Sequence, residues 1–271
     1  MSEAVETLEG NLRDPWSLPL EQVDAAKGEI FEQDAALPIF ERLRKEDPVH
    51  YHQDSRFGPY WSVTRYQDIK HVDMHHELYS SAQGITIFDG SNDFRTPMFI
   101  AMDPPKHDEQ RKAVAPVAGP RNLAAMETTI RQRVCDILDT LPLGETFNWL
   151  DSDSIELTTQ MLATLFDFPF EDRRKLTRRS DVASNGPQHG VVESLEQRRT
   201  ELLECLQTFT ELWHQRAAQP EPGNDLISML AHGEATRVMV NNPMEYLGNL
   251  MLLIVGGNDT SRNSISGGVL A

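Results

Sequence analysis

Residues 247–261 read Leu-Gly-Asn-Leu-Met-Leu-Leu-Ile-Val-Gly-Gly-Asn-Asp-Thr-Ser, an apolar run that ends in two glycines and four polar residues. The run from 247 to 255 is apolar nearly all round, which is typical of a helix buried in the centre of a larger helical body. Two adjacent glycines inside a helix cost about 1 kcal/mol each relative to alanine. The pattern therefore indicates either close approach of a bulky ligand or a local opening of the helix.

Asp259 and Thr260 follow the glycine pair and place a carboxylate and a hydroxyl inside this apolar stretch. An unpaired polar group is expensive in such surroundings, so a function is expected for them. The alternative is a helix kink with local bonds from side chains to the backbone. A phosphate-binding loop is disfavoured, because the segment has no lysine and no preceding strand.

Hydrophobic periodicity predicts the rest of the fold, with helices over 35–45, 66–74, 103–114, 123–141, 153–166, 171–181, 193–218, 225–231 and 243–271. Between Val49 and Tyr66 the pattern changes to strand formers on either side of a Phe-Gly-Pro turn, which predicts a hairpin. The expected fold class is therefore mainly α with a small β element, in one domain. Residues 1–34 are polar and are expected to form an arm on the surface, followed by the body over 35–271.

A second segment of interest is Asp103-Pro-Pro-Lys-His-Asp-Glu-Gln-Arg111, which opens a helix with a carboxylate followed by proline. His107 and Arg111 are four residues apart and so share one helix face. An arginine and a histidine on one face suit a carboxylate or a phosphate. The alternative is an ordinary solvated helix face.

The segment from Tyr79 to Met102 contains turn residues but keeps many apolar side chains. A long loop with this content is more typical of a binding loop than of a linker. The residues expected to line a binding site are Ile85, Ile87, Phe88, Met98 and Phe99.

Charge and composition exclude several classes of protein. The 25 basic and 42 acidic residues give a net charge of −17, which argues against a nucleic-acid partner and against anionic lipid. The longest strictly apolar run, residues 250–255, is too short for a transmembrane segment. With no secretory signal visible and 2 cysteines in all, we expect an acidic, soluble, cytoplasmic protein.

His71, His75 and His76 form a candidate metal site, because two of these histidines lie four residues apart. No carboxylate or cysteine completes a recognisable ligand set, so solvated histidines are favoured. Cys135 and Cys205 lie among apolar neighbours on predicted helices and are expected to be core thiols.

Three features occur in order along the chain: the hairpin, the Asp-Pro-Pro-x-His-x-x-x-Arg helix at 103–111, and Gly-Gly-x-Asp-Thr-Ser at 256–261. Together they resemble the cytochrome P450 family of haem-thiolate monooxygenases. Segments 99–108 and 256–263 are most similar to the soluble bacterial branch, and within it to the terminal hydroxylases of medium-chain alkanes and fatty acids. The resemblance implies the N-terminal part of that fold, ending within the long central helix over the haem.

The resemblance also implies how a haem would be held. His107 and Arg111 would bind the haem propionates. Gly256 and Gly257 would let the long helix pass close to the porphyrin.

For catalysis, the resemblance implies that Asp259 and Thr260 relay protons to dioxygen, and that the apolar loop lines a channel for an aliphatic substrate. No flavin or iron–sulfur motif occurs in these residues, so a ferredoxin and its reductase are the implied electron donors.

The sequence departs from the family in one respect. The family needs a cysteine thiolate in a Phe- and Gly-rich loop, and a Glu-x-x-Arg helix, both beyond the Gly-Gly helix. Neither occurs here, and Cys135 and Cys205 both precede that helix, so no iron ligand is assigned. We expect the chain to be the front part of a longer enzyme and to be inactive alone.

The sequence leaves two alternative functions to compare with this one. The chain could stand alone as an α-helical binder of hydrophobic ligands that uses the same apolar loop. A hydrolase with Ser261 or Thr260 as nucleophile is disfavoured, because no histidine follows the motif and no strand-turn-helix surrounds it.

Overall fold

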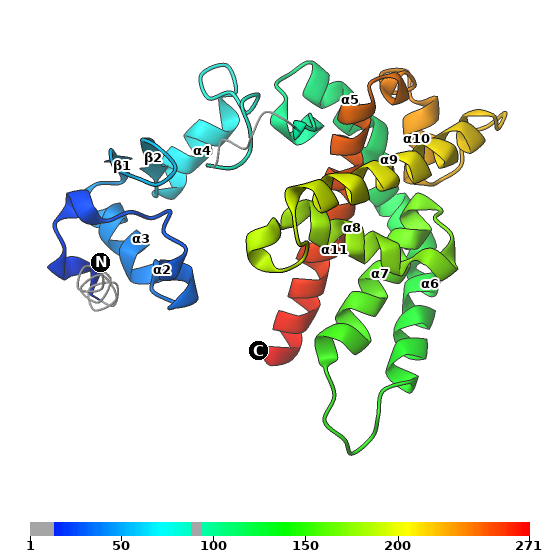
Figure 1. Ribbon diagram of the computed structural model, residues 1–271, viewed down its shortest axis with the longest axis horizontal. Helices are drawn as coiled ribbons and strands as arrows, with labels where there is room; N and C mark the ends of the chain where they lie inside the picture. Colours follow the sequence, from blue (N-terminus) through cyan, green and yellow to red (C-terminus); the bar gives the residue numbers. More distant parts are fainter. Residues whose placement is uncertain (1–13, 88–93) are drawn as a thin grey trace. The chain divides into compact units, whose positions relative to one another are not determined.

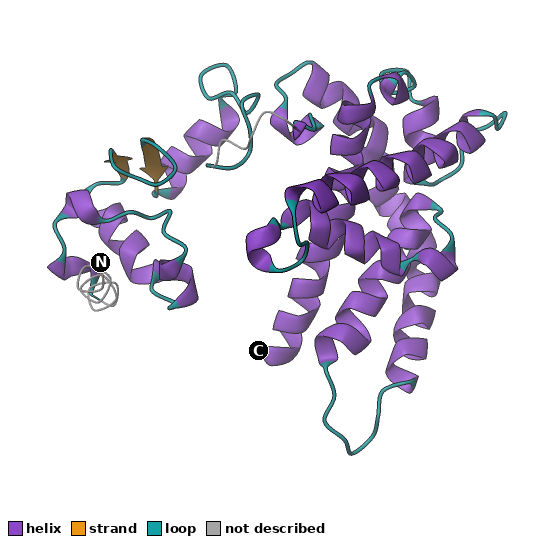
Figure 2. Ribbon diagram, viewed as in Figure 1, coloured by secondary structure: helices purple, strands orange, loops and turns teal. Residues whose placement is uncertain are grey.

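The computed structural model describes residues 14–87 and 94–271, and the chain divides into two compact units, residues 1–90 and 91–271. Figures 1 and 2 show that helices dominate the described chain and that the strands are confined to one short hairpin. The predicted fold class, mainly α with a small β element, is confirmed. Within these described ranges, no helix combines the length and the apolar composition needed to cross a bilayer.

The first unit is built around a short amphipathic helix. Its elements are α2 (Glu29–Glu32), α3 (Ala36–Glu46), β1 (Val49–His52), β2 (Tyr60–Val63) and α4 (Tyr66–Met74), with 3-10 turns at 15–17 and 20–22. Residues 14–34 differ from the surface arm expected for this part of the chain, because Val23, Ala25 and Ile30 are buried against α3. The apolar side of α3 must be buried against other residues, and residues 14–34 supply them. The largely polar composition of residues 14–34 gave no indication of this packing.

The predicted hairpin is confirmed: β1 and β2 pair antiparallel, with Val49 opposite Val63 and Tyr51 opposite Trp61. The face that the hairpin buries carries histidines, since His50 and His52 are each 4% exposed while Val49 and Tyr51 are about two fifths exposed. Each buried ring has a polar contact. His50 Nδ1 lies 2.8 Å from a carboxylate oxygen of Asp47, and His52 Nε2 lies 2.8 Å from the Ser62 hydroxyl.

These buried histidines predict that acid weakens the first unit. Burial lowers the pKa of His52 below its ordinary value of 6.5, and His50 lowers it further, against the opposing charges of Asp24 and Asp47. The unfolded chain therefore takes up a proton at a higher pH than the folded hairpin does. Stability should be complete above pH 6.5 and decline as the pH falls below that value.

Hydrogen exchange of the β1 and β2 amides, corrected for the intrinsic exchange rate at each pH, gives the free energy of opening of the hairpin between pH 8 and pH 5. In a His52→Gln variant this free energy should lose most of its pH dependence, because glutamine does not titrate. If the free energy of opening in the variant changes with pH as steeply as in the wild type, the assignment to His52 is contradicted.

The second unit contains α5 (Lys106–Val114), α6 (Pro120–Asp139), α7 (Ile155–Phe166), α8 (Arg174–Ser184), α9 (Leu195–Ala217), α10 (Leu226–His232) and α11 (Pro243–Leu270). Shorter turns lie at 99–101, 115–118, 150–154, 170–172, 187–189 and 239–241. Every helix predicted here is present, with ends moved by at most three residues. The helix expected from residue 103 begins at Lys106, after the two prolines rather than at the first of them.

The long helix α11, red in Figure 1, organises this unit by packing against α7, α8 and α9. Its residues Tyr246, Leu247, Leu250 and Ile254 are fully buried in a core shared with these helices. Beyond Val255 the helix is no longer buried on all sides, because Gly256 and Thr260 are exposed. The second half of α11 therefore has one packed side and one open side.

Candidate functional site

The two adjacent glycines of α11 have different surroundings. Among the residues that the structure describes, a methyl group added at Gly256 would meet nothing within 4 Å, whereas one added at Gly257 would lie 2.7 Å from Cδ2 of Leu162 on α7. The helix runs without interruption through both positions, so neither glycine marks an opening. Gly257 therefore has a packing reason, the close approach of α7, while Gly256 leaves bare backbone on the open side of α11.

Thr260 lies one turn beyond Gly256 on the same open side. Its hydroxyl donates to the Gly256 carbonyl at 2.7 Å, and the residue is exposed. The Thr260 hydroxyl is thus satisfied by a bond to its own helix, which is the local bonding that the alternative interpretation predicted. The kink that this interpretation also predicted is absent from α11, which is unbroken. A bare backbone patch and a hydroxyl consequently share one exposed face.

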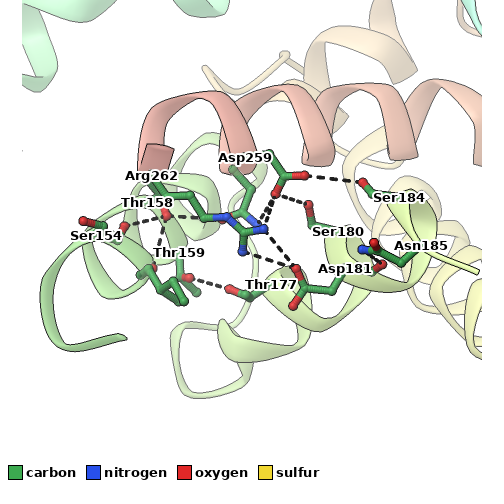
Figure 3. Close-up of polar contacts among 12 residues, drawn as sticks. Ser154, Thr158, Thr159, Thr177, Ser180, Asp181, Ser184, Asn185, Asp259 and Arg262 are labelled. Carbon is green, nitrogen blue, oxygen red and sulfur yellow. Dashed lines mark hydrogen bonds and ion pairs between the residues drawn. The ribbon is translucent and has the colours of Figure 1, made fainter. Parts of the chain in front are cut away.

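Asp259 points the other way, toward α8 (Figure 3). Its carboxylate accepts hydrogen bonds from Ser180 at 3.1 Å and from Ser184 at 3.4 Å, and it pairs with Arg262 at 2.9 Å. The side chain is 24% exposed, so the carboxylate is held firmly yet still reaches solvent. The sequence motif placed Asp259 and Thr260 next to each other, and the fold directs them to different neighbours.

Arg262 extends this contact into a bridge between two helices. Its Nη1 and Nη2 each lie 3.2 Å from Oδ1 of Asp181 on α8, while Nη2 also contacts Asp259 (Figure 3). One guanidinium therefore lies between two carboxylates, all three groups being at least two thirds buried. Such pairs are screened less by solvent than surface pairs are, so the bridge fixes α8 against α11. Sequence reasoning missed Arg262, although its spacing of three from Asp259 was visible.

On α5, His107 and Arg111 share a face as predicted. His107 Nδ1 lies 2.8 Å from Asp108, and its ring centroid is 6.3 Å from that of Phe99. Arg111 is exposed, and within residues 14–87 and 94–271 it makes no ion pair. A free guanidinium is available for an external carboxylate, which is the chemistry expected from this spacing.

A buried polar network joins α5 to α11, and the sequence did not single it out. Gln110 donates to Glu245 at 2.6 Å, and Asn249 donates to the Gln110 side-chain carbonyl at 3.0 Å. The available signal was the pair Glu245 and Asn249, two polar residues four apart at the start of an otherwise apolar helix. Spacing of four puts them on one face and so indicates a shared partner.

The five residues predicted to line a substrate channel are divided between the two units. Ile85 and Ile87 are exposed in the first unit, and Phe88 lies outside the described residues. In the second unit Met98 is half-buried and Phe99 is buried.

Gly248 explains how the segment before Phe99 reaches α11. A methyl group there would lie 2.1 Å from the carbonyl oxygen of Pro97, so the backbone of the loop runs directly against the helix. This glycine was not recognised from the sequence, where it sits unremarked inside the apolar run.

The cysteines and histidines offer no metal centre in the parts of the chain that the structure describes, where no three possible ligands cluster. Cys205 is a core thiol as expected, and its burial raises its pKa to about 12. The expectation for Cys135 is wrong: it is exposed on the outer side of α6. Cys135 has apolar neighbours in the sequence, but it is not surrounded by apolar side chains in the fold, because only one side of α6 packs.

No family model matches the chain, but individual proteins do. The linalool 8-monooxygenase of Pseudomonas putida is 31% identical over 259 residues, which cover 91% of this chain and 63% of that protein. The structure of CYP153D17 from Sphingomonas sp. PAMC 26605 matches with a TM-score of 0.80 at 45% identity, covering 92% of this chain and 62% of the other. Cytochrome P450-153 from Novosphingobium aromaticivorans matches with a TM-score of 0.79 at 43% identity, covering 90% and 62%.

These matches extend over nearly the whole chain and agree in both sequence and fold. The matched proteins are a bacterial monooxygenase and two bacterial cytochromes P450. The chain belongs to the cytochrome P450 family, as its motifs indicated. It spans about three fifths of the length of these relatives, and membership implies a haem in the complete protein.

Proposed function

We propose that the complete protein containing these residues is a haem-dependent monooxygenase that hydroxylates an unactivated C–H bond of an aliphatic substrate with dioxygen. The observation that carries this proposal is the open face of α11, where Gly256 exposes bare backbone and Thr260 presents a hydroxyl one turn away. The packing of α11 needs neither the bare backbone at Gly256 nor the Thr260 hydroxyl. The backbone is therefore available to a cofactor, and the hydroxyl to a reacting oxygen.

The residues present fit a haem in two respects. Gly256 leaves the backbone of α11 open to the approach of a flat macrocycle, since no atom of residues 14–87 and 94–271 lies within 4 Å of a methyl group placed there. Arg111 has no ion-pair partner in the described chain, and with His107 on the same face it suits a propionate. Bound haem supplies the activation of dioxygen. Gly257 acts on the other side of α11, by admitting Leu162.

Asp259 and Thr260 are proposed to move protons toward the open face. Asp259 exchanges protons with solvent on the α8 side, where its carboxylate meets the exposed Ser184 hydroxyl. Thr260 holds its hydroxyl proton on the Gly256 carbonyl; turned to the open face, the hydroxyl would pass one proton on and take another from water there, so that it ends unchanged. A positioned acid of this kind typically contributes about 10²–10⁴-fold to a rate.

For the substrate we propose a medium-chain alkane or fatty acid. The family resemblance implies that its channel is lined by Ile85, Ile87, Phe88, Met98 and Phe99. The similarity of segments 99–108 and 256–263 to the terminal hydroxylases supports this choice. We also propose a ferredoxin and its reductase as electron donors, and a cytoplasmic location. Neither cysteine is proposed as the iron ligand, so residues 1–271 alone are expected to be inactive.

The proposal is tested by comparing the complete protein with residues 1–271. With haem and reductant, the complete protein should give the carbon monoxide spectrum of a thiolate-ligated haem and convert octane or octanoate to the terminal alcohol. Residues 1–271 should give no such spectrum. If the complete protein lacks this spectrum, the monooxygenase proposal is wrong. Tight binding of fatty acid by residues 1–271 without haem would instead favour the stand-alone binder of hydrophobic ligands.

A further inference from the structure

The buried polar network between α5 and α11 consists of Gln110, Glu245 and Asn249. None of these residues belongs to the proposed proton relay or to the residues proposed to contact haem. Gln110, Glu245 and Asn249 are 4%, 7% and 0% exposed, so each must find its hydrogen-bond partners within the protein. Gln110 Nε2 donates to Glu245 Oε1 at 2.6 Å, and Asn249 Nδ2 donates to Gln110 Oε1 at 3.0 Å. Asn249 Oδ1 accepts the backbone amide of Phe99 at 2.8 Å.

The direction of these hydrogen bonds leaves each amide a single useful orientation. Glu245 accepts further hydrogen bonds from Lys106 at 2.7 Å and Asn242 at 3.0 Å, and so it acts only as an acceptor. Turning over the Gln110 amide would set its carbonyl against this carboxylate and its NH₂ against the NH₂ of Asn249. A fully connected network of this kind specifies one arrangement of the elements that supply it.

The elements that the network fixes are those that carry the proposed haem-binding and substrate-lining residues. Successive residues of a helix are about 100° apart, so Arg111 lies on the face of α5 next to that of Gln110, together with His107. The Phe99 amide belongs to the loop that crosses α11 at Gly248. One end of the network therefore sets the rotation of α5, and the other sets the position of this loop.

We propose that Gln110 and Asn249 are positioning residues, which orient the His107–Arg111 face of α5 for the haem propionates and place the Phe99 turn beside α11. This inference rests on the proposed function, because it assigns the face of α5 to haem. It goes further by dividing the work: Gln110 governs α5 alone, whereas Asn249 governs both α5 and the Phe99 turn.

The test uses the complete protein, with Gln110→Met and Asn249→Leu as variants of similar volume. The matched control is Thr177→Val, which breaks another buried pair, the hydroxyl contact of 2.5 Å between Thr159 and Thr177 that joins α7 to α8. Three quantities are measured: the urea midpoint, the exchange rate of the Phe99 amide before haem is added, and the affinity for haem. All three variants should lose stability, so stability alone does not distinguish positioning from packing.

Haem affinity should fall about 10-fold in Gln110→Met and Asn249→Leu, as is usual when a group that orients a ligand is removed, and should stay within about 2-fold in Thr177→Val. The Phe99 amide should exchange about 10-fold faster in Asn249→Leu and remain protected in Gln110→Met, which keeps the Asn249 acceptor. If Asn249→Leu fails to fold, Asn249→Asp replaces it. This variant keeps the side-chain oxygen that accepts the Phe99 amide, so the Phe99 amide should stay protected while the affinity for haem falls.

Equal haem affinity in the two network variants and the control would overturn the positioning role and leave the proposed function intact. Equal exchange of Phe99 in Gln110→Met and Asn249→Leu would overturn the division of work between the two residues. A wild-type protein that binds no haem would overturn the proposed function and this inference with it.

Discussion

Replacing Thr260 by alanine in the haem-loaded complete protein is expected to uncouple reductant consumption from product formation. The hydroxyl beside Gly256 is then missing from the open face of α11, so protons reach dioxygen there without a positioned donor. We expect product formed per reductant oxidised to fall about 10-fold, less than a full general-acid contribution because water replaces part of the lost function. Substrate binding should be largely kept, since the substitution removes only a hydroxyl and a methyl group.

The matched control for this prediction is Thr260→Ser, which keeps the hydroxyl and should keep most of the coupling. Neither variant should lose more than about 1 kcal/mol of stability, because the side chain is exposed and its hydrogen bond closes on its own helix. The ratio of alcohol formed to reductant consumed, with peroxide measured in parallel, reports the result. Unchanged coupling in Thr260→Ala would refute the relay role.

The second large effect is expected in the fold, from Gly248→Ala. The added methyl group would lie 2.1 Å from the Pro97 carbonyl oxygen and 2.7 Å from that of Thr96, and both are backbone atoms. Overpacking costs about 1–3 kcal/mol where side chains can adjust, so a backbone collision should cost about 3 kcal/mol or more. Urea denaturation of the purified chain, followed by circular dichroism, measures the loss.

Gly256→Ala is the matched control, since it makes the same change in the same helix where nothing lies within 4 Å. It should raise stability without haem by about 1 kcal/mol, the difference in helix propensity. In the haem-loaded protein it should lower haem affinity, because the methyl group stands where the macrocycle approaches. Equal destabilisation by both alanines would show that the loop does not cross α11 at Gly248.

The helices could be predicted well because their apolar residues recur at helical spacing. The polar stretch 14–34 was the main error, since its three buried apolar residues are scattered and show no period. The hairpin was predicted correctly from Tyr60 to Val63 and its turn, but not which face would be buried. His50 and His52 face inward, where Asp47 and Ser62 each contact one ring nitrogen, and a contact across the hairpin such as that of His52 with Ser62 is invisible to periodicity.

The candidate site was predicted unevenly. Local spacing placed His107 with Arg111 on one face and Gly256 near Thr260, because four residues make about one helical turn. The partners of Asp259 on α8 could not be predicted, since Ser180 and Ser184 lie on another helix some 75–79 residues away in sequence. Arg262 lay within reach of the same spacing rule and was overlooked.

The sequence by itself determined the helical class, the order of the two motifs and the family, because these depend on local periodicity and on residue identity. Only the tertiary structure decided what each motif residue faces. It separated Gly256, which opens a surface, from Gly257, which admits Leu162, and it turned Asp259 toward α8 while leaving Thr260 on the open side. The physical reason is that a helix repeat fixes relative directions along one element, whereas the packing of α7, α8 and the Phe99 loop decides which of those directions are filled.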